Sequence, residues 1–231
     1  MNRARTIEAL KKSGVENPVN ESGVIDLSDV RLQGVNLGAA YLHRASLHKA
    51  RFVDVNLFCA NLNEADLTGA IFMASCLNYA NLSKSCLIGV YAMDVWMWEA
   101  DLHGADLTEA NLDGAHLRNA DLTGANLTDA DLSNADLTGA YLSGAKASLK
   151  SHELVAEILR QAAGDDPARR ALAGLILVSP DWDWPEILSL DLDPEVCSWG
   201  IATLLSDPAW GYAEVLQKES VSPSECHHNE C

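Results

Sequence analysis

The chain has 231 residues, of which 33 are Asp or Glu and 16 are Lys or Arg, so its net charge is −17. This charge repels phosphate backbones, and we expect no direct binding to DNA or RNA. Apolar residues make up 48% of the chain, which is typical of a globular protein. No run approaches the roughly 18 apolar residues of a membrane span, so we expect no membrane partner.

Residues 1–24 are predicted to form a capping helix and a linker. Residues 6–13 are predicted to be helical, with Ile7 and Leu10 on one face. Two lysines in the last turn and Gly14 after it are signals that end a helix. The first residues lack the apolar core of a signal peptide, and the six cysteines are scattered rather than spaced as a disulfide framework. We therefore predict a reducing, cytoplasmic location.

Residues 25–146 are organised by a repeat of five residues. The central residue of the repeat recurs in unbroken register from Leu27 to Leu142: of 24 centres, 20 are Leu, two are Phe, and the exceptions are Ala92 and Met97. A small or slim residue stands two positions before each centre, and Asp or Asn stands between them in 13 copies. A period of five fits neither a helix nor a strand, so we expect a chain that turns a corner every five residues.

Four such corners close a square coil of 20 residues. Coils stacked at the strand spacing of about 4.8 Å allow every backbone group to pair with the coils above and below. The Leu and the small residue point inward, because two large side chains on each face would overfill the lumen. The other three residues of each repeat point outward.

The motif A-(D/N)-L-x-x, as in Ala100-Asp101-Leu102, resembles that of the pentapeptide-repeat family. The resemblance covers 120 of the 231 residues. It implies a β-solenoid, the right-handed quadrilateral pentapeptide-repeat β-helix of the family, here of about six coils. A few members of the family bind DNA gyrase. Quinolone-resistance members typically carry loops that interrupt the coils and commonly dimerise through the C-terminal end of the solenoid, whereas this chain has no such loop between Ile25 and Gly144.

A small α-helical domain is predicted for residues 147–220, followed by a disordered tail at 221–231. Ser151 is a candidate N-cap, and three Asp-Pro pairs, the first at Asp166-Pro167, each favour a helix start. The predicted core of this domain contains Trp182, Trp184, Trp199 and Trp210.

Large apolar side chains are predicted to point outward around one corner of the solenoid. On the second face these are Ile71, Met73, Tyr91 and Met93, and on the third face they are Phe58, Tyr79, Trp96 and Trp98. We call these eight residues the aromatic patch. A contiguous apolar patch usually marks a contact surface, and Trp, Tyr and Met are enriched in interfaces. We expect a protein partner of unknown identity, with a homodimer among the candidates.

Two other interpretations of the aromatic patch stay open. The C-terminal helices of the same chain could cover it. Alternatively, the segment from Met93 to Trp98 could form a local bulge, because Ala92 is too small to fill the lumen.

The part of the predicted solenoid that is nearer to the C-terminus is acidic. Its candidate residues for mimicry of duplex phosphates are Asp101, Asp106, Asp121, Asp131 and Asp136. Such mimicry would make DNA gyrase a candidate partner. In the alternative interpretation, Asp before Leu only contributes turn hydrogen bonds and solubility.

The sequence offers no convincing catalytic or metal site. His43 and His48 lie on neighbouring faces, without a nucleophile or a paired carboxylate in register with them. The tail from Cys226 to Cys231 holds four potential metal ligands, but their spacing is too cramped for a usual structural zinc site. We therefore predict a non-catalytic protein-protein interaction or scaffold protein without a cofactor. The alternative is a DNA-mimicking protein that binds gyrase or another topoisomerase and inhibits it or protects it from drugs.

Overall fold

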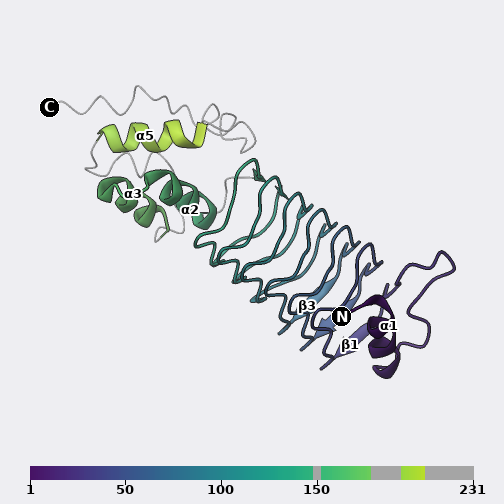
Figure 1. The fold of residues 1–231 in the computed structure, drawn as a ribbon. Helices are drawn as coiled ribbons and strands as arrows, with labels where there is room; N and C mark the ends of the chain where they lie inside the picture. The colour runs from purple at the N-terminus through teal and green to yellow at the C-terminus, as the bar shows by residue number, and fades with distance from the viewer. Residues whose placement is uncertain (148–151, 178–193, 206–231) are drawn as a thin grey trace. The chain divides into compact units, whose positions relative to one another are not determined.

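The computed structural model describes residues 1–147, 152–177 and 194–205. These fall into two compact units, Met1–Ala145 and Lys146–Cys231. The elements in chain order are α1 (Arg3–Lys12), β1 (Arg31–Gln33), β2 (Arg51–Val53), β3 (Ile71–Met73), β4 (Asn126–Leu127), β5 (Lys146–Ala147), α2 (His152–Ala163), α3 (Pro167–Leu177) and α5 (Pro194–Leu205) (Figure 1). The predictions for Ser151, Trp182, Trp184, Trp210 and the tail from Cys226 lie outside the described residues.

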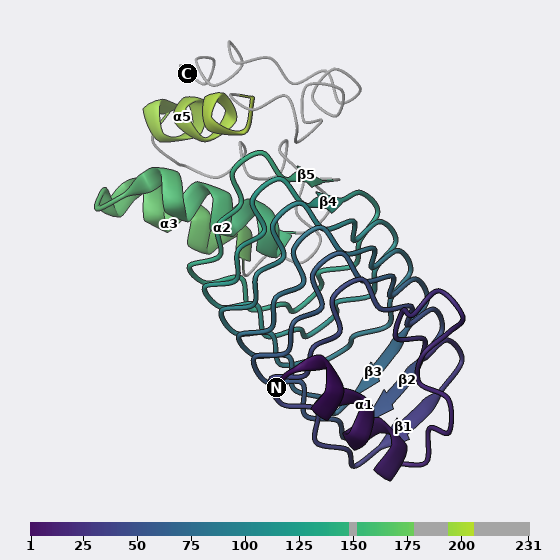
Figure 2. The same cartoon turned by 45° about the vertical axis from the view of Figure 1, so that its right-hand side comes forward.

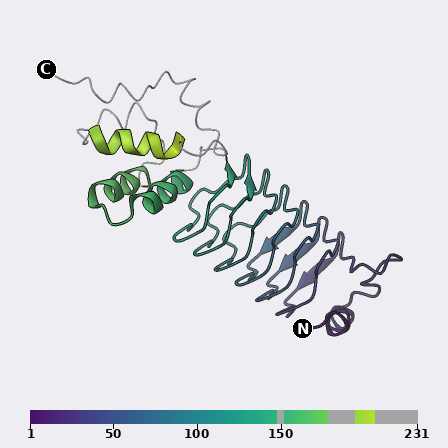
Figure 3. The ribbon, with the colours of Figure 1, turned by 45° about the horizontal axis from the view of Figure 1, so that its top comes forward.

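The first unit is a β-solenoid built from parallel backbone pairing. Isolated bridges join residues twenty positions apart, as in Asn36 with Asn56. The Leu37 N–H donates to the Asn56 carbonyl at 2.7 Å, and the Asn56 N–H donates to the Val35 carbonyl at 3.0 Å. Figure 3 shows the successive coils stacked along the solenoid. The predicted β-solenoid is confirmed in its parallel pairing, while its handedness and the number of coils stay predictions.

The solenoid has four faces, which we number by their first central residues. The first face starts at Leu27, the second at Leu32, the third at Leu37 and the fourth at Leu42, and each recurs every twenty residues. On the second face β1, β2 and β3 form a parallel sheet (Figure 2). Because residues twenty apart are neighbours, outward side chains form columns along the solenoid.

Every corner of the solenoid has one residue in the left-handed region. This corner residue is the second residue after each centre, from Asp29 to Gly144. At 16 corners it is not glycine. Glycine adopts a positive φ without strain, and Asn and Asp tolerate it better than bulky residues do. The corner position therefore prefers small or turn-forming residues, and a large side chain there adds backbone strain.

The lumen is filled as the repeat predicts. Every central residue from Leu27 to Leu142 is buried, and Ala92 and Met97 are each only 3% exposed. The rings of Phe52 and Phe72 stack with their centroids 4.8 Å apart. Because the lumen is packed with apolar side chains, it stabilises the fold and leaves no channel for a ligand.

Helix α1 begins three residues earlier than predicted. The Asn2 side chain accepts the N–H of Arg5 at 3.0 Å and caps the helix. Leu10 is buried as expected, but the second buried residue is Thr6, while Ile7 is half-buried. The helical face that packs is thus rotated from the face that hydrophobicity alone indicated.

Thr6 is buried because its hydroxyl joins α1 to the solenoid. Its Oγ1 accepts the Tyr41 N–H at 2.9 Å and donates to the Asn2 carbonyl at 3.2 Å. The Tyr41 N–H belongs to the first row of the solenoid, whose N–H groups have no preceding coil to bond with. α1 therefore pairs an open edge, as expected of a cap.

In the second unit, helix α2 buries Leu154, Val155, Ile158 and Leu159. Asp166 caps α3 by accepting the N–H groups of Ala168 and Arg169 at 3.0 and 3.1 Å. The Arg169 guanidinium lies 4.9 Å from the centroid of the Trp199 ring, so it links α3 to α5. Within the ranges that the structure describes, no helix is both long and apolar enough to cross a membrane.

Ser75 takes the place of the usual alanine for a structural reason. Its Oγ accepts the Val55 N–H at 3.2 Å and lies 3.3 Å from the Phe52 carbonyl. Ser85 occupies the same repeat position, but its Oγ only donates, to the Leu82 carbonyl at 2.6 Å. Ser75 therefore satisfies a buried backbone donor, whereas Ser85 does not.

We predict that Ser75→Ala lowers the free energy of unfolding by about 1–3 kcal/mol, the cost of leaving a buried donor unpaired. Ser85→Ala is the matched control and should change it by less than about 1 kcal/mol, because alanine is the common residue there. Urea unfolding followed by circular dichroism measures both. Equal losses in the two variants would contradict the proposed role of Ser75.

Candidate functional site

The residues of the aromatic patch lie on the outer surface of the solenoid. Six of them are 39–52% exposed, namely Phe58, Met73, Tyr79, Tyr91, Trp96 and Trp98. Ile71 and Met93 are half-buried. A large part of each of these six side chains remains in water, so each stabilises the fold less than a fully buried side chain of the lumen does.

On the third face, Trp96 and Trp98 form one cluster with a histidine. Their ring centroids are 5.1 Å apart in an edge-to-face arrangement. His116 stacks on Trp96 at 4.2 Å and meets Trp98 edge-on at 6.4 Å. His116 was not among the predicted residues of the aromatic patch, although its position twenty residues after Trp96 places it next to that ring.

Phe58 and Tyr79 form a second aromatic pair on the third face. Their ring centroids are 5.4 Å apart. The Tyr79 hydroxyl donates to the Glu99 carboxylate at 3.1 Å, and this hydrogen bond raises the pKa of Tyr79. Phe58, Tyr79, Trp96 and Trp98 are named the third-face group.

Tyr79 stands at a corner position with a φ of 59°. A bulky residue in the left-handed region is strained, and glycine would be relaxed there. Other long side chains, such as Arg44 and Glu99, occupy the same corner position with a positive φ, so this strain is common to many corners of the solenoid.

The second-face group consists of Ile71, Met73, Tyr91 and Met93. Ile71 belongs to β3 and is the bridge partner of Tyr91. The Tyr91 hydroxyl donates to the Met93 sulfur at 2.6 Å. The ring contacts and the hydrogen bond described above each join side chains of one group. The aromatic patch therefore has two parts on adjoining faces.

The solenoid register does not break at the aromatic patch. Trp96 bridges Cys76 below and His116 above, and Ala92 remains buried. In this ladder the bond from the Trp96 N–H to the Ser75 carbonyl is longer, at 3.5 Å. The alternative of a local bulge is therefore wrong, because the backbone ladder continues across the small Ala92.

The five acidic candidates serve the turns of the solenoid. Each carboxylate accepts, through Oδ1, the N–H of the residue two positions later at 2.9 to 3.1 Å, in Asp101, Asp106, Asp121, Asp131 and Asp136. At Asp26 the same bond from the Ser28 N–H holds the pKa below its usual value. These carboxylates therefore have a local structural role.

The same five residues do not share one face. Asp101 and Asp121 are bridge partners on the fourth face, whereas Asp106, Asp131 and Asp136 lie on the first, second and third faces respectively. Their charges therefore surround the solenoid instead of forming a single acidic strip.

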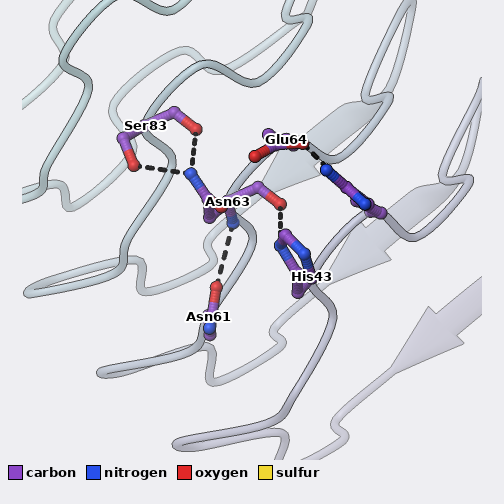
Figure 4. A network of polar contacts seen from close by, with 6 residues as sticks. His43, Asn61, Asn63, Glu64 and Ser83 are labelled. Atoms are coloured by element: carbon purple, nitrogen blue, oxygen red, sulfur yellow. Dashed lines mark hydrogen bonds and ion pairs between the residues drawn. The ribbon is translucent and has the colours of Figure 1, made fainter.

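His43 belongs to a polar network on the fourth face (Figure 4). Its Nδ1 lies 3.0 Å from the Asn63 carbonyl, and the Asn63 side chain donates to the Ser83 carbonyl and Oγ, each at 2.8 Å. Beside them, Arg44 bonds Glu64 at 2.7 Å and lowers the pKa of Glu64. The network links successive coils and contains no acid, base and nucleophile arranged for catalysis.

A hollow of about 640 Å³ lies beside the linker that follows α1. Its ionisable lining residues are Glu16, Glu21, Asp26 and Arg31, a set without histidine or cysteine. In the described part of the chain, no three His, Cys, Asp or Glu side chains are grouped to hold a metal ion.

Comparison with known families identifies the solenoid. The family model of pentapeptide repeats matches residues 25–58, 51–89 and 100–139, in eight copies. The solenoid of this chain thus carries pentapeptide repeats, as its motif predicts. Proteins of this class are generally structural or interaction proteins rather than enzymes.

Solved structures of the same class are similar to this chain. HetL, a pentapeptide repeat protein involved in heterocyst differentiation regulation from the cyanobacterium Nostoc sp. strain PCC 7120, is 30% identical over 52% of this chain and 62% of its own, with a TM-score of 0.26. This chain therefore spans less than two thirds of HetL. Rfr23 from the cyanobacterium Cyanothece 51142 is 23% identical over 58% of this chain and 93% of its own, with a TM-score of 0.29.

A third similar structure is QnrB1, a plasmid-mediated fluoroquinolone resistance protein. It is 21% identical over 59% of this chain and 81% of its own, with a TM-score of 0.30. A search of curated proteins gives no match.

We predict that Asp121→Ala lowers the free energy of unfolding by about 0.5–1.5 kcal/mol, because the Thr123 N–H loses its acceptor. Asp121→Asn keeps an oxygen in the same place and should retain most of the stability. Chemical unfolding of both variants provides the measurement. If the two variants lose the same stability, the charge of Asp121 matters more than the turn hydrogen bond.

Proposed function

We propose that this protein is a non-catalytic interaction or scaffold protein that binds a protein partner through the third-face group. The observation that carries the proposal is the contiguous exposure of large aromatic side chains on a rigid solenoid. Trp96 and Trp98 pack edge-to-face, so their rings are held in place before a partner binds. Preorganised aromatic side chains make strong contacts because little conformational entropy remains to be lost.

The packing of Tyr79 supports the same proposal. Its ring is 47% exposed and lies edge-on beside Phe58, with the ring centroids 5.4 Å apart. The pair therefore adds exposed aromatic surface to the third-face group.

The chemistry around the third-face group indicates a partner surface of mixed character. Glu99 lies next to Tyr79, and Asp136 lies 3.8 Å from Arg118 on the same face. An apolar centre with charged residues at its edge is the usual composition of a transient protein interface. We further propose a reducing, cytoplasmic location, which the free thiols of Cys59, Cys76 and Cys86 support.

We predict that Trp98→Glu abolishes capture of the partner while the protein stays folded. The side chain is 39% exposed and packs against Trp96 and His116 on the outer surface, so its replacement should lower the melting temperature only modestly while the lumen stays intact. Affinity capture from cells that express tagged full-length protein, followed by mass spectrometry, compares the bound proteins. Tyr79→Gly is a second variant, and it should weaken capture while keeping or raising stability.

Tyr141→Glu is the matched control for this experiment. Tyr141 is 63% exposed and lies on the fourth face, away from the third-face group. It should therefore retain the captured proteins. If Trp98→Glu instead lowers the melting temperature strongly, the ring is buried against the chain itself, and the proposal fails.

One observation supports a second candidate function, a DNA-mimicking protein that binds gyrase or another topoisomerase. Asp101 and Asp121 are bridge partners, so their carboxylates repeat along one face at the coil spacing. The column continues with Asn81 below and Tyr141 above, which are uncharged. Two carboxylates make a short acidic strip, and we therefore rank this candidate second.

We expect full-length protein to leave the supercoiling activity of DNA gyrase unchanged, even at a large molar excess. The physical reason is that the acidic residues are distributed over four faces. A gel-based supercoiling assay, with and without a quinolone, makes the measurement. Inhibition or drug protection that disappears in the double variant Asp101→Asn, Asp121→Asn would replace the first candidate with the second, since asparagine keeps the turn bond and removes the charge.

A further inference from the structure

One column of outward residues on the second face changes from basic to acidic along the solenoid. Consecutive members of the column are bridge or strand partners. In order along the solenoid, they are Arg31, Arg51, Ile71, Tyr91, Asn111 and Asp131. The column is therefore basic at one end, apolar in the middle and acidic at the other end.

The neighbouring column on the same face follows a related order. It begins with Gln33, Val53 and Met73, which are strand partners in β1, β2 and β3. The repeat then places Met93, Asp113 and Ser133 in the same column. Both columns thus have apolar residues at the centre of the face, and Asp113 adds negative charge toward the acidic end.

The terminal charges of the first column are available to a partner. Arg31, Arg51 and Asp131 are all exposed. No ion pair within the described ranges involves any of the three. Asp131 accepts the Ser133 N–H through Oδ1, which leaves its other oxygen free to accept a hydrogen bond.

The column is complementary to the same column read in the opposite direction. Its basic end then meets the acidic end of the second copy, and the two apolar centres meet each other. In an isologous dimer, a two-fold axis that lies in the interface plane and runs perpendicular to the solenoid axis brings each column against the same column running in the opposite direction. With the axis at the level between Ile71 and Tyr91, these two residues face each other across the interface. Arg31 then faces Asp131 at both ends.

The remaining positions agree with this arrangement. Met73 faces Met93 at the centre, and Arg51 faces Asn111, with Asp113 in the adjacent column within reach of the long arginine side chain. A parallel dimer would place residues of the same coil level together, so its basic ends would meet each other. The antiparallel arrangement is favoured because it pairs opposite charges and joins apolar residues.

We propose that the second face binds a second copy of this chain, in an antiparallel homodimer centred on the second-face group. The inference goes beyond the proposed function, which depends on the third-face group. The two proposals share only the premise that the aromatic patch is a contact surface. They concern different residues and can fail separately.

The interface is expected to be weak. A single face of the solenoid is narrow, and stable protein interfaces usually bury about 1,200–2,000 Å² in total. We therefore expect a monomer-dimer equilibrium with a dissociation constant on the order of micromolar. Exposed ion pairs are screened by salt, so added salt should shift the equilibrium toward monomer without abolishing the apolar contact.

The test uses sedimentation velocity of the full-length chain over a wide concentration range, with the variants Arg31→Asp and Asp131→Arg. Each variant alone places like charges opposite each other at both ends of the dimer. We therefore expect its dissociation constant to rise about tenfold. An equimolar mixture of the two variants restores opposite charges at both ends. We expect the mixture to dimerise like wild type.

The fold should tolerate both substitutions. Arg31→Asp places an Asp directly before the central Leu32, and Asp is a preferred residue at this position of the repeat. Asp131→Arg places an Arg at the same repeat position, where Arg51 already occurs. Asp101→Arg and Lys49→Asp are the matched controls, since they make the same charge changes on the fourth and first faces. Both controls should dimerise like wild type.

Any one of four results would overturn the proposal. Wild-type protein could remain monomeric at the highest concentration, the controls could disrupt the dimer as strongly as the two variants do, or the mixture could fail to restore dimerisation. Trp98→Glu separates the two proposals: a variant that dimerises normally but no longer captures a partner supports both of them. Loss of dimerisation in Trp98→Glu would show that the third face forms the contact, which would overturn the second-face dimer.

Discussion

The structure of this protein depends on hydrogen bonds between the backbone groups of successive coils, which join residues nineteen or twenty-one positions apart. A bond such as that from the Leu37 N–H to the Asn56 carbonyl fixes each coil against the next. The chain can continue this pairing only if it turns at every fifth residue, and each corner takes a left-handed residue. The packed lumen and the columns of outward residues both follow from this one constraint.

The same constraint decides where function can lie. A lumen filled by residues such as Phe52 and Phe72 leaves no internal cavity for a substrate. Backbone groups are used in the ladders, so recognition must come from side chains on the faces. Most of these are small or polar and serve the turns, as the carboxylate of Asp121 does for the Thr123 N–H. The large exposed aromatic side chains are the exception, and they carry the proposed function.

A solenoid also converts sequence order into surface chemistry in a simple way. Residues separated by twenty positions become neighbours, so a gradual change along the chain becomes a gradient along a face. On the second face this gradient runs from Arg31 to Asp131. On the third face the same rule stacks His116 on Trp96. Adjoining faces can therefore carry different contacts while sharing one rigid scaffold.

The sequence by itself determined the solenoid, its register and the eight residues of the aromatic patch, because an unbroken period of five assigns every residue to a face. It could not determine how side chains meet. The role of Thr6 in the cap, the acceptor role of Ser75 and the stacking of His116 depend on distances between atoms of different coils. Only the tertiary structure decided these contacts, since side-chain orientation and hydrogen-bond geometry are set by packing and not by the repeat.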